Sequence, residues 1–169
     1  MARWLIAENN WGTVSTTSIH LKGTAFGNLV SYADGPKGNS TGRLLFYLTP
    51  MDATATDLAQ CHTSEPTPPL LPKKSRTFGG IIHDPTCAKV SISGPMRIVP
   101  KHELDAAEEL LFQRHPQMKN WPKGHNFSVW ELHVAAVRLL DFYGGAAVVP
   151  PEDYFAAKLQ LQRRGESVA

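Results

Sequence analysis

The order of its strand-like segments is the feature that most restricts what this chain can fold into. About six segments carry strand patterns, and two or three short helices lie among them without the regular strand–helix alternation that builds a parallel sheet. This order favours an antiparallel barrel with helical additions, that is, a mainly β fold with flanking helices. The expected strands cover residues 11–21, 26–33, 44–49, 88–99 and 127–143.

Two of these segments are interrupted. Residues 88–99 contain Gly94-Pro95, which predicts a bulge or bend within a strand. Residues 127–143 run up to Gly144-Gly145 and are long enough for two strands or one sharply bent strand. In contrast, residues 44–49 form a continuous apolar run, as expected of a strand covered on both faces.

The helical signals are shorter. Residues 101–115 place Leu104, Ala107 and Leu111 on one face at helical spacing, and Pro116 ends the segment. We also expect a short helix over 52–62 and a terminal helix that opens at Pro150-Pro151, where proline suits a first turn. The four prolines within 63–76 predict an exposed loop, and residues 160–169 are expected to fray.

Composition excludes several classes of protein. The 169 residues, 42% hydrophobic and 19% charged, fit one globular domain, 1–169, rather than a disordered chain. With 17 basic and 15 acidic residues the net charge is +2, so nucleic-acid binding is not expected. No apolar run approaches the roughly 18 residues of a membrane span. The first residues are too short for a signal-peptide core, which leaves a cytoplasmic or organellar protein, or one whose targeting segment has been removed.

Motifs for catalysis and metal binding are missing from the sequence. It has no glycine-rich phosphate loop, nucleophile elbow or paired metal-binding cysteines, so no catalytic residue is assigned. A zinc site from Cys61, His62, His83 and Cys87 is disfavoured because the adjacent pair cannot easily face one ion. Cys61 and Cys87 flank the proline-rich loop, so they are either a disulfide that pins it or two buried thiols.

Two sequons offer glycosylation sites. Asn39-Ser40-Thr41 lies in an expected loop, where a glycan fits, and Asn126-Phe127-Ser128 stands at the start of an expected strand, where it fits less well. Because chance alone gives about one such site in a chain of this composition, the sequons by themselves prove nothing.

A series of segments resembles one known family in the same order along the chain. The most telling are RHPQMKNWP (114–122) and DFYGG (141–145) followed by PPEDYF (150–155). WLIAENNWGTVSTTS, GTAFGNLVSYADGP, FYLTP and CAKVSISG precede them. Together they resemble CREG-type proteins, small glycoproteins on the flavin-binding split-barrel fold of pyridoxamine 5′-phosphate oxidase.

The resemblance implies a six-stranded split barrel that pairs as a homodimer and is secreted or endolysosomal. It also implies that flavin is absent, although wider relatives bind flavin mononucleotide (FMN) or handle haem. In this family a barrel strand follows residue 58, where this chain has its proline-rich loop. Residues 77–83 are the candidate replacement, although Gly79-Gly80 weakens their strand pattern.

One segment indicates whether the chain could hold the phosphate of a flavin. In flavin-binding relatives the residues after the FYLTP-like strand resemble LAxHTxNL, whose His and Thr help hold the phosphate. Here the matching stretch is MDATATDL (51–58), in which Thr54 replaces the His and Asp57 the Asn. Residues 44–58 contain no cation, and a carboxylate repels a phosphate by about 1 kcal/mol per contact in water. Flavin binding is therefore disfavoured unless Lys101 or Lys119 compensates in three dimensions.

Three hypotheses follow. The first is a non-catalytic, dimeric glycoprotein of the CREG type that acts by binding other proteins, with no cofactor. The second is an FMN-dependent oxidoreductase. The third is a haem-handling protein with His115 or His133 as axial ligand. Under the second hypothesis, hydroxyl groups would line the cofactor site, and the candidates are Ser31, Tyr32, Tyr47, Thr49, Thr54 and Thr56.

Overall fold

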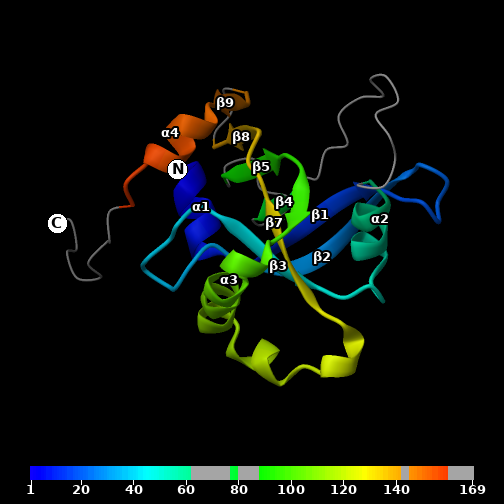
Figure 1. Ribbon diagram of the computed structural model, residues 1–169. Helices are drawn as coiled ribbons and strands as arrows, with labels where there is room; N and C mark the ends of the chain where they lie inside the picture. Colours follow the sequence, from blue (N-terminus) through cyan, green and yellow to red (C-terminus); the bar gives the residue numbers. More distant parts are fainter. Residues whose placement is uncertain (62–76, 80–87, 142–144, 160–169) are drawn as a thin grey trace.

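The computed structural model describes residues 1–61, 77–79, 88–141 and 145–159, and their strands form two antiparallel sheets (Figure 1). The expected proline-rich loop, the frayed tail and Cys87 lie outside these residues, so neither the loop nor the disulfide is tested. The first sheet has the order β1 (Trp11–Thr17), β2 (Ala25–Ala33), β3 (Leu44–Leu48), β7 (Ser128–Leu132) and β6 (Met96–Ile98). The second has the order β4 (Thr77–Gly79), β5 (Lys89–Ser93), β8 (Ala136–Leu140) and β9 (Ala147–Val149).

Two of the connections that carry the chain from one sheet to the other lie side by side. β5 passes into β6 through Gly94-Pro95, and β7 passes into β8 through residues 133–135. The two corners are joined by hydrogen bonds of 2.9 Å from the amide of His133 to the carbonyl of Pro95 and from the amide of Ala135 to that of Ser93. At the far edges, β4 lies against β1. The result is a split barrel, as the family resemblance implies.

Several strand predictions are confirmed and two need correction. β3 is covered on both faces, and residues 127–143 do supply two strands, β7 and β8. Residues 88–99, expected to be one bent strand, are two strands in different sheets, because the bend at Gly94 is a sheet corner. The first strand ends at Thr17 rather than at residue 21. After it, Lys22 (φ 53°) and Gly23 (φ 90°) make a tight turn, in which the amide of Gly23 donates a hydrogen bond to the carbonyl of Ser18. Residues 77–79 pair with β5 and so do provide a barrel strand.

The helices cover the outside of the barrel. α2 (Ala53–Cys61), α3 (Lys101–Arg114) and α4 (Pro151–Ala156) form where the sequence predicts them, and Ala107 and Leu111 on the expected face of α3 are fully buried. α1 (Ala2–Glu8) was not expected. Two short 3₁₀ turns, η1 (Pro116–Asn120) and η2 (Lys123–His125), connect α3 to β7. None of the helices among the described residues has the length and apolar character needed to cross a bilayer.

Apolar side chains form two clusters, one inside the barrel and one beneath α3. The inner cluster includes Val14, Phe46, Val90, Ile92 and Leu132. The second lies on the other face of β3 and includes Leu45, Val99, Ala107, Leu111, Met118 and Val129. β3 contributes to both, which is why its sequence is apolar throughout.

Buried polar contacts attach α1 and α4 to the loop after β2. The guanidinium of Arg3, only 5% exposed, donates to the carbonyls of Ser40 and Thr41 at 2.9 Å. The hydroxyl of Tyr154 donates to the carbonyl of Gly42 at 3.1 Å. Asp34 accepts from the hydroxyl of Ser40, and burial raises the pKa of its carboxyl above the ordinary value. These contacts hold the loop on the barrel end.

The corner at Gly94 predicts a large effect of adding one methyl group. A Cβ there would stand 1.8 Å from the carbonyl oxygen of His133, a backbone atom that cannot move without breaking the corner. We expect Gly94→Ala to lower the free energy of unfolding by about 3 kcal/mol or more, measured by urea denaturation. Gly124→Ala is the matched control, because nothing lies within 4 Å of its added Cβ, and it should change stability by less than about 1 kcal/mol. Equal stability of the two variants would contradict this description of the corner.

Candidate functional site

A group of aromatic rings stands on the outer face of β3, where the connection from α3 to β7 folds over it. Tyr47 stacks on Phe127 with ring centroids 4.9 Å apart and on Trp121 at 6.0 Å. Trp121 and Phe127 are themselves 4.9 Å apart. Tyr47 and Phe127 are brought together because β3 and β7 pair with Tyr47 opposite Val129. The three rings, Tyr47, Trp121 and Phe127, are called the aromatic wall below.

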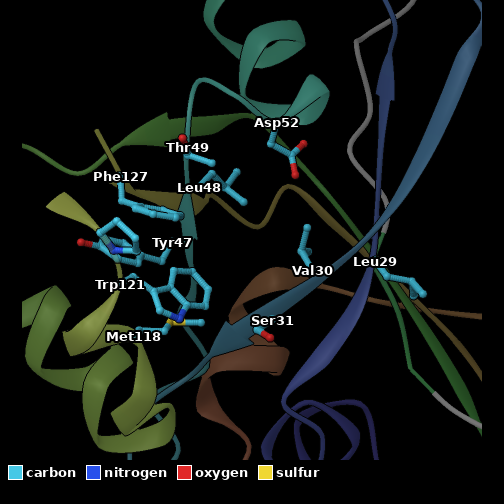
Figure 2. Close-up of a pocket in the computed structure, with 11 residues that line it drawn as sticks. Leu29, Val30, Ser31, Tyr47, Leu48, Thr49, Asp52, Met118, Trp121 and Phe127 are labelled. Atoms are coloured by element: carbon cyan, nitrogen blue, oxygen red, sulfur yellow. The ribbon is translucent and has the colours of Figure 1, made fainter. Parts of the chain in front are cut away.

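The aromatic wall forms one side of an open cavity of about 460 Å³ (Figure 2). Figure 2 shows the three rings gathered together, with Met118 below Trp121, and Val30 and Ser31 of β2 across from them. Its size lies in the range of small-molecule sites. The lining consists of Leu29, Val30, Ser31, Tyr47, Leu48, Thr49, Asp52, Met118, Trp121, Pro122 and Phe127.

Asp52 is the one charged residue among the described residues of this lining. Its Oδ1 accepts a 2.7 Å hydrogen bond from the amide of Thr54, so it caps the start of α2. Both carboxylate oxygens also accept from the side-chain amide of Asn28 on β2, at 3.0 and 2.9 Å. Both partners are neutral, and within the described part of the chain Asp52 makes no ion pair. These hydrogen bonds hold the carboxylate in place without neutralising its negative charge.

The lysines considered from the sequence do not reach the cavity. Lys119 lies with its ammonium 5.9 Å from the ring centroid of Phe112, and neither it nor Lys101 belongs to the lining. Asp57 also lies outside the cavity lining. It is buried and accepts from the hydroxyl of Thr16 and the amide of Ile19, which ties α2 to the end of β1. Within the described ranges the cavity lining thus carries one carboxylate and no cation.

The six hydroxyl residues named from the sequence divide into two groups. Ser31, Tyr47 and Thr49 line the cavity. Tyr32 is buried on the opposite face of β2, where its hydroxyl donates to the carbonyl of Ile6 at 2.8 Å. Thr54 is fully buried, and its hydroxyl accepts from Asn28.

Thr56, the last of the six, donates to the carbonyls of Pro50 and Asp52, which directly precede α2. The structure therefore brings three of the six hydroxyl residues together at the cavity.

The two histidines considered as haem ligands lie outside the cavity. His115 is buried, with its Nε2 2.8 Å from the carbonyl oxygen of Tyr32. His133 is exposed at the sheet corner. No cluster of three or more potential metal ligands occurs in the described ranges, which omit His62, His83 and Cys87.

Both sequon asparagines are exposed. Asn39 lies in the loop after β2, as expected. Asn126 precedes β7 instead of starting it and has left-handed backbone angles, φ 52° and ψ 47°, at the end of η2. This position is a turn, so the expectation that Asn126 starts a strand is wrong.

Sequence reasoning missed most of the cavity wall. Met118, Trp121 and Phe127 come from a connection that is far from β3 in the sequence, and only the fold brings them to Tyr47. The signal available was the aromatic content of 112–127 together with Pro116 and Pro122, which prevent a continuous helix.

Comparison with known proteins identifies the family. The family model described as "CREG, beta-barrel" matches residues 1–156. The chain belongs to the CREG family.

Among curated relatives of this CREG-family chain, Protein CREG1 of Mus musculus is 35% identical over 163 residues, covering 95% of this chain and 74% of the relative. Protein CREG2 of the same species is 36% identical over 162 residues, covering 92% of this chain and 55% of the relative. The chain thus spans three-quarters of one relative and about half of the other.

Solved structures similar to this CREG-family chain share the split-barrel fold at low identity. The haem-binding protein from Mycobacterium smegmatis has a TM-score of 0.73 and 23% identity, with 93% of this chain and 59% of that chain covered. An FAD-binding protein from Mesorhizobium loti has a TM-score of 0.57 and 9% identity, with 82% and 90% covered. Identities this low show the fold alone.

Proposed function

We propose that this CREG-family chain is a non-catalytic binding protein whose cavity has lost the means to hold a flavin phosphate. The observation that carries the proposal is the charge of the cavity, whose lining, among the described residues, includes Asp52 and no lysine, arginine or histidine. The protein acts by binding other proteins, and the split barrel serves as a scaffold rather than as an oxidoreductase.

The physical basis is the cost of placing a phosphate beside Asp52. A phosphate monoester needs arginine, lysine or several oriented donors. The backbone amide of Thr54 and the side-chain amide of Asn28 are oriented donors beside the cavity. Both already donate hydrogen bonds to Asp52. Like charges about 4 Å apart repel by about 1 kcal/mol in water and by about 4 kcal/mol near a protein surface.

The flavin and haem alternatives have support from the fold, because similar structures are named as FAD-binding and haem-binding proteins. In this chain an FMN would find Ser31, Tyr47 and Thr49 as hydroxyl partners and the aromatic wall for its ring system. Neither His115 nor His133 lines the cavity to ligate a haem iron. The non-catalytic proposal is therefore the better supported, and the alternatives become outcomes of the ligand test.

The proposal predicts that FMN does not bind. We expect no saturable quenching of tryptophan fluorescence, to which Trp121 in the wall contributes, up to about 100 μM FMN. Asp52→Asn keeps a capping side chain and removes the charge, so it should bind FMN more tightly than the natural chain does. Purification of a yellow protein with stoichiometric FMN would overturn the proposal, as would a haem Soret band.

We further propose that the protein is a homodimer that uses the outer face of the β1–β2 hairpin. In the register of these strands, Trp11 stands opposite Ser31 and Thr13 opposite Leu29, all on one face. Trp11 is 47% and Leu29 68% exposed, and the rest of that face is small and uncharged. An uncharged face with large exposed apolar side chains is typical of an interface.

Light scattering tests the dimer. We expect twice the chain mass at micromolar concentration, and a monomer for the double variant Trp11→Ser, Leu29→Ser, because it removes the two largest apolar groups of the face. The double variant Ile98→Ser, Val148→Ser, which removes exposed apolar groups from other strands, is the control and should stay dimeric. A monomeric natural chain would contradict the proposal.

We also propose that the protein is a secreted or endolysosomal glycoprotein. Support comes from the exposed positions of Asn39 and Asn126, and from the membership of the CREG family.

After expression through a eukaryotic secretory pathway, we expect an intact mass above that of the chain, restored by an N-glycosidase. Asn39→Gln and Asn126→Gln should each remove one glycan. Protein from its native source with unmodified asparagines would contradict this prediction.

A further inference from the structure

From the same cavity we infer a ligand class: an organic cation, specifically an ammonium group with alkyl substituents, held between the aromatic wall and Asp52. The inference rests on the proposed function in one respect, since it requires that the cavity is not a flavin-phosphate site.

The aromatic wall offers what an alkylated ammonium group binds best. Aromatic faces carry a negative quadrupole, and Trp, Tyr and Phe bind quaternary ammonium ions in this way. Here Tyr47, Trp121 and Phe127 are in mutual contact at 4.9–6.0 Å and all three line the same cavity. Because these rings are partly shielded from water, the attraction is stronger than at an open surface.

Asp52 adds a full negative charge on the same cavity, and two features keep it available. Its hydrogen bonds come from neutral amides, which orient the carboxylate without cancelling its charge. These bonds also come from two different elements, β2 and the start of α2, so the carboxylate is fixed before any ligand arrives. A fixed charge saves the cost of ordering the side chain on binding.

The remaining lining fits the alkyl substituents. Leu29, Val30 and Leu48 contribute apolar atoms to the lining from β2 and β3, while the side chains of Val30 and Leu48 also pack into the barrel core. The buried Met118 lies beneath Trp121 (Figure 2). This combination of apolar surface, aromatic faces and one carboxylate discriminates against anions and against neutral polar ligands. The cation can come from a free small molecule or from a lysine side chain of a partner protein, and the two sources share this chemistry.

Choline and its neutral isostere 3,3-dimethyl-1-butanol test the charge directly, because they differ in replacing a quaternary nitrogen by carbon. We expect choline to bind to the full chain at least tenfold more tightly, measured by saturation-transfer NMR of the methyl protons with titration. Equal affinity of the two probes, or no binding of either, would overturn the inference.

Variants assign the binding to the cavity. Asp52→Asn should weaken choline binding about five- to tenfold and leave the isostere unchanged, because asparagine preserves the helix cap. Trp121→Leu should weaken choline more than the isostere. Asp105→Asn, which removes the same charge from an exposed site on α3 outside the lining, should change neither. Loss of choline binding in Asp105→Asn equal to that in Asp52→Asn would overturn the assignment.

A second arm distinguishes the source of the cation. The peptide acetyl-Gly-Lys-Gly-amide is compared with the same peptide containing norleucine. Preference for the lysine peptide supports a partner's side chain, and binding of choline alone supports a small molecule. FMN is titrated in parallel: FMN binding overturns the proposed function, whereas failure of choline selectivity with no FMN binding overturns only this inference.

Discussion

The corner at which two strands change sheets positions everything else. Gly94 packs against the backbone of His133 so closely that no side chain fits, and paired amide–carbonyl bonds fix the two connections to each other. This contact sets the register of β7, which then pairs with β3 so that Val129 lies opposite Tyr47. Phe127, two residues before Val129, is thereby placed against the ring of Tyr47. The aromatic wall is a consequence of backbone geometry about six residues away along β7.

Asp52 both caps α2 and sets the charge of the cavity. A capping carboxylate at the start of α2 stabilises the helix by about 1 kcal/mol, whatever lies nearby. In this fold the same oxygens border the cavity, and Asn28 holds them from β2. Removal of the charge without loss of the cap requires a neutral capping side chain, such as asparagine. The polarity of the cavity is therefore tied to the stability of α2, and a phosphate-binding version of this segment needs a different start to the helix.

The sequence predicted the elements better than their arrangement. β3 and α3 were predictable because their patterns reflect burial on two faces and on one face, and both patterns are local. α1 was missed because the apolar residues of its seven-residue segment suit either a helix or a strand. Long-range contacts hold it, among them those of Arg3 with the loop after β2. The break at Gly94 was visible, but its meaning as a change of sheet depends on His133, far along the chain.

The same limit applies to the site. Tyr47 and Thr49 alternate along one extended segment, so their shared face could be inferred, whereas Thr54 turns to Asn28 once α2 forms. No local pattern indicates that Trp121 reaches Tyr47.

Family membership and cavity chemistry answer different questions. The CREG match covers residues 1–156 and places the chain on a scaffold shared with haem- and FAD-binding proteins. The fold shapes the cavity, and the few charged side chains that line the cavity select the class of ligand. Here the aromatic wall is compatible with any flat or cationic group, so the rings alone do not discriminate. Asp52 does, because a carboxylate held by neutral amides in a partly shielded cavity attracts cations and repels anions.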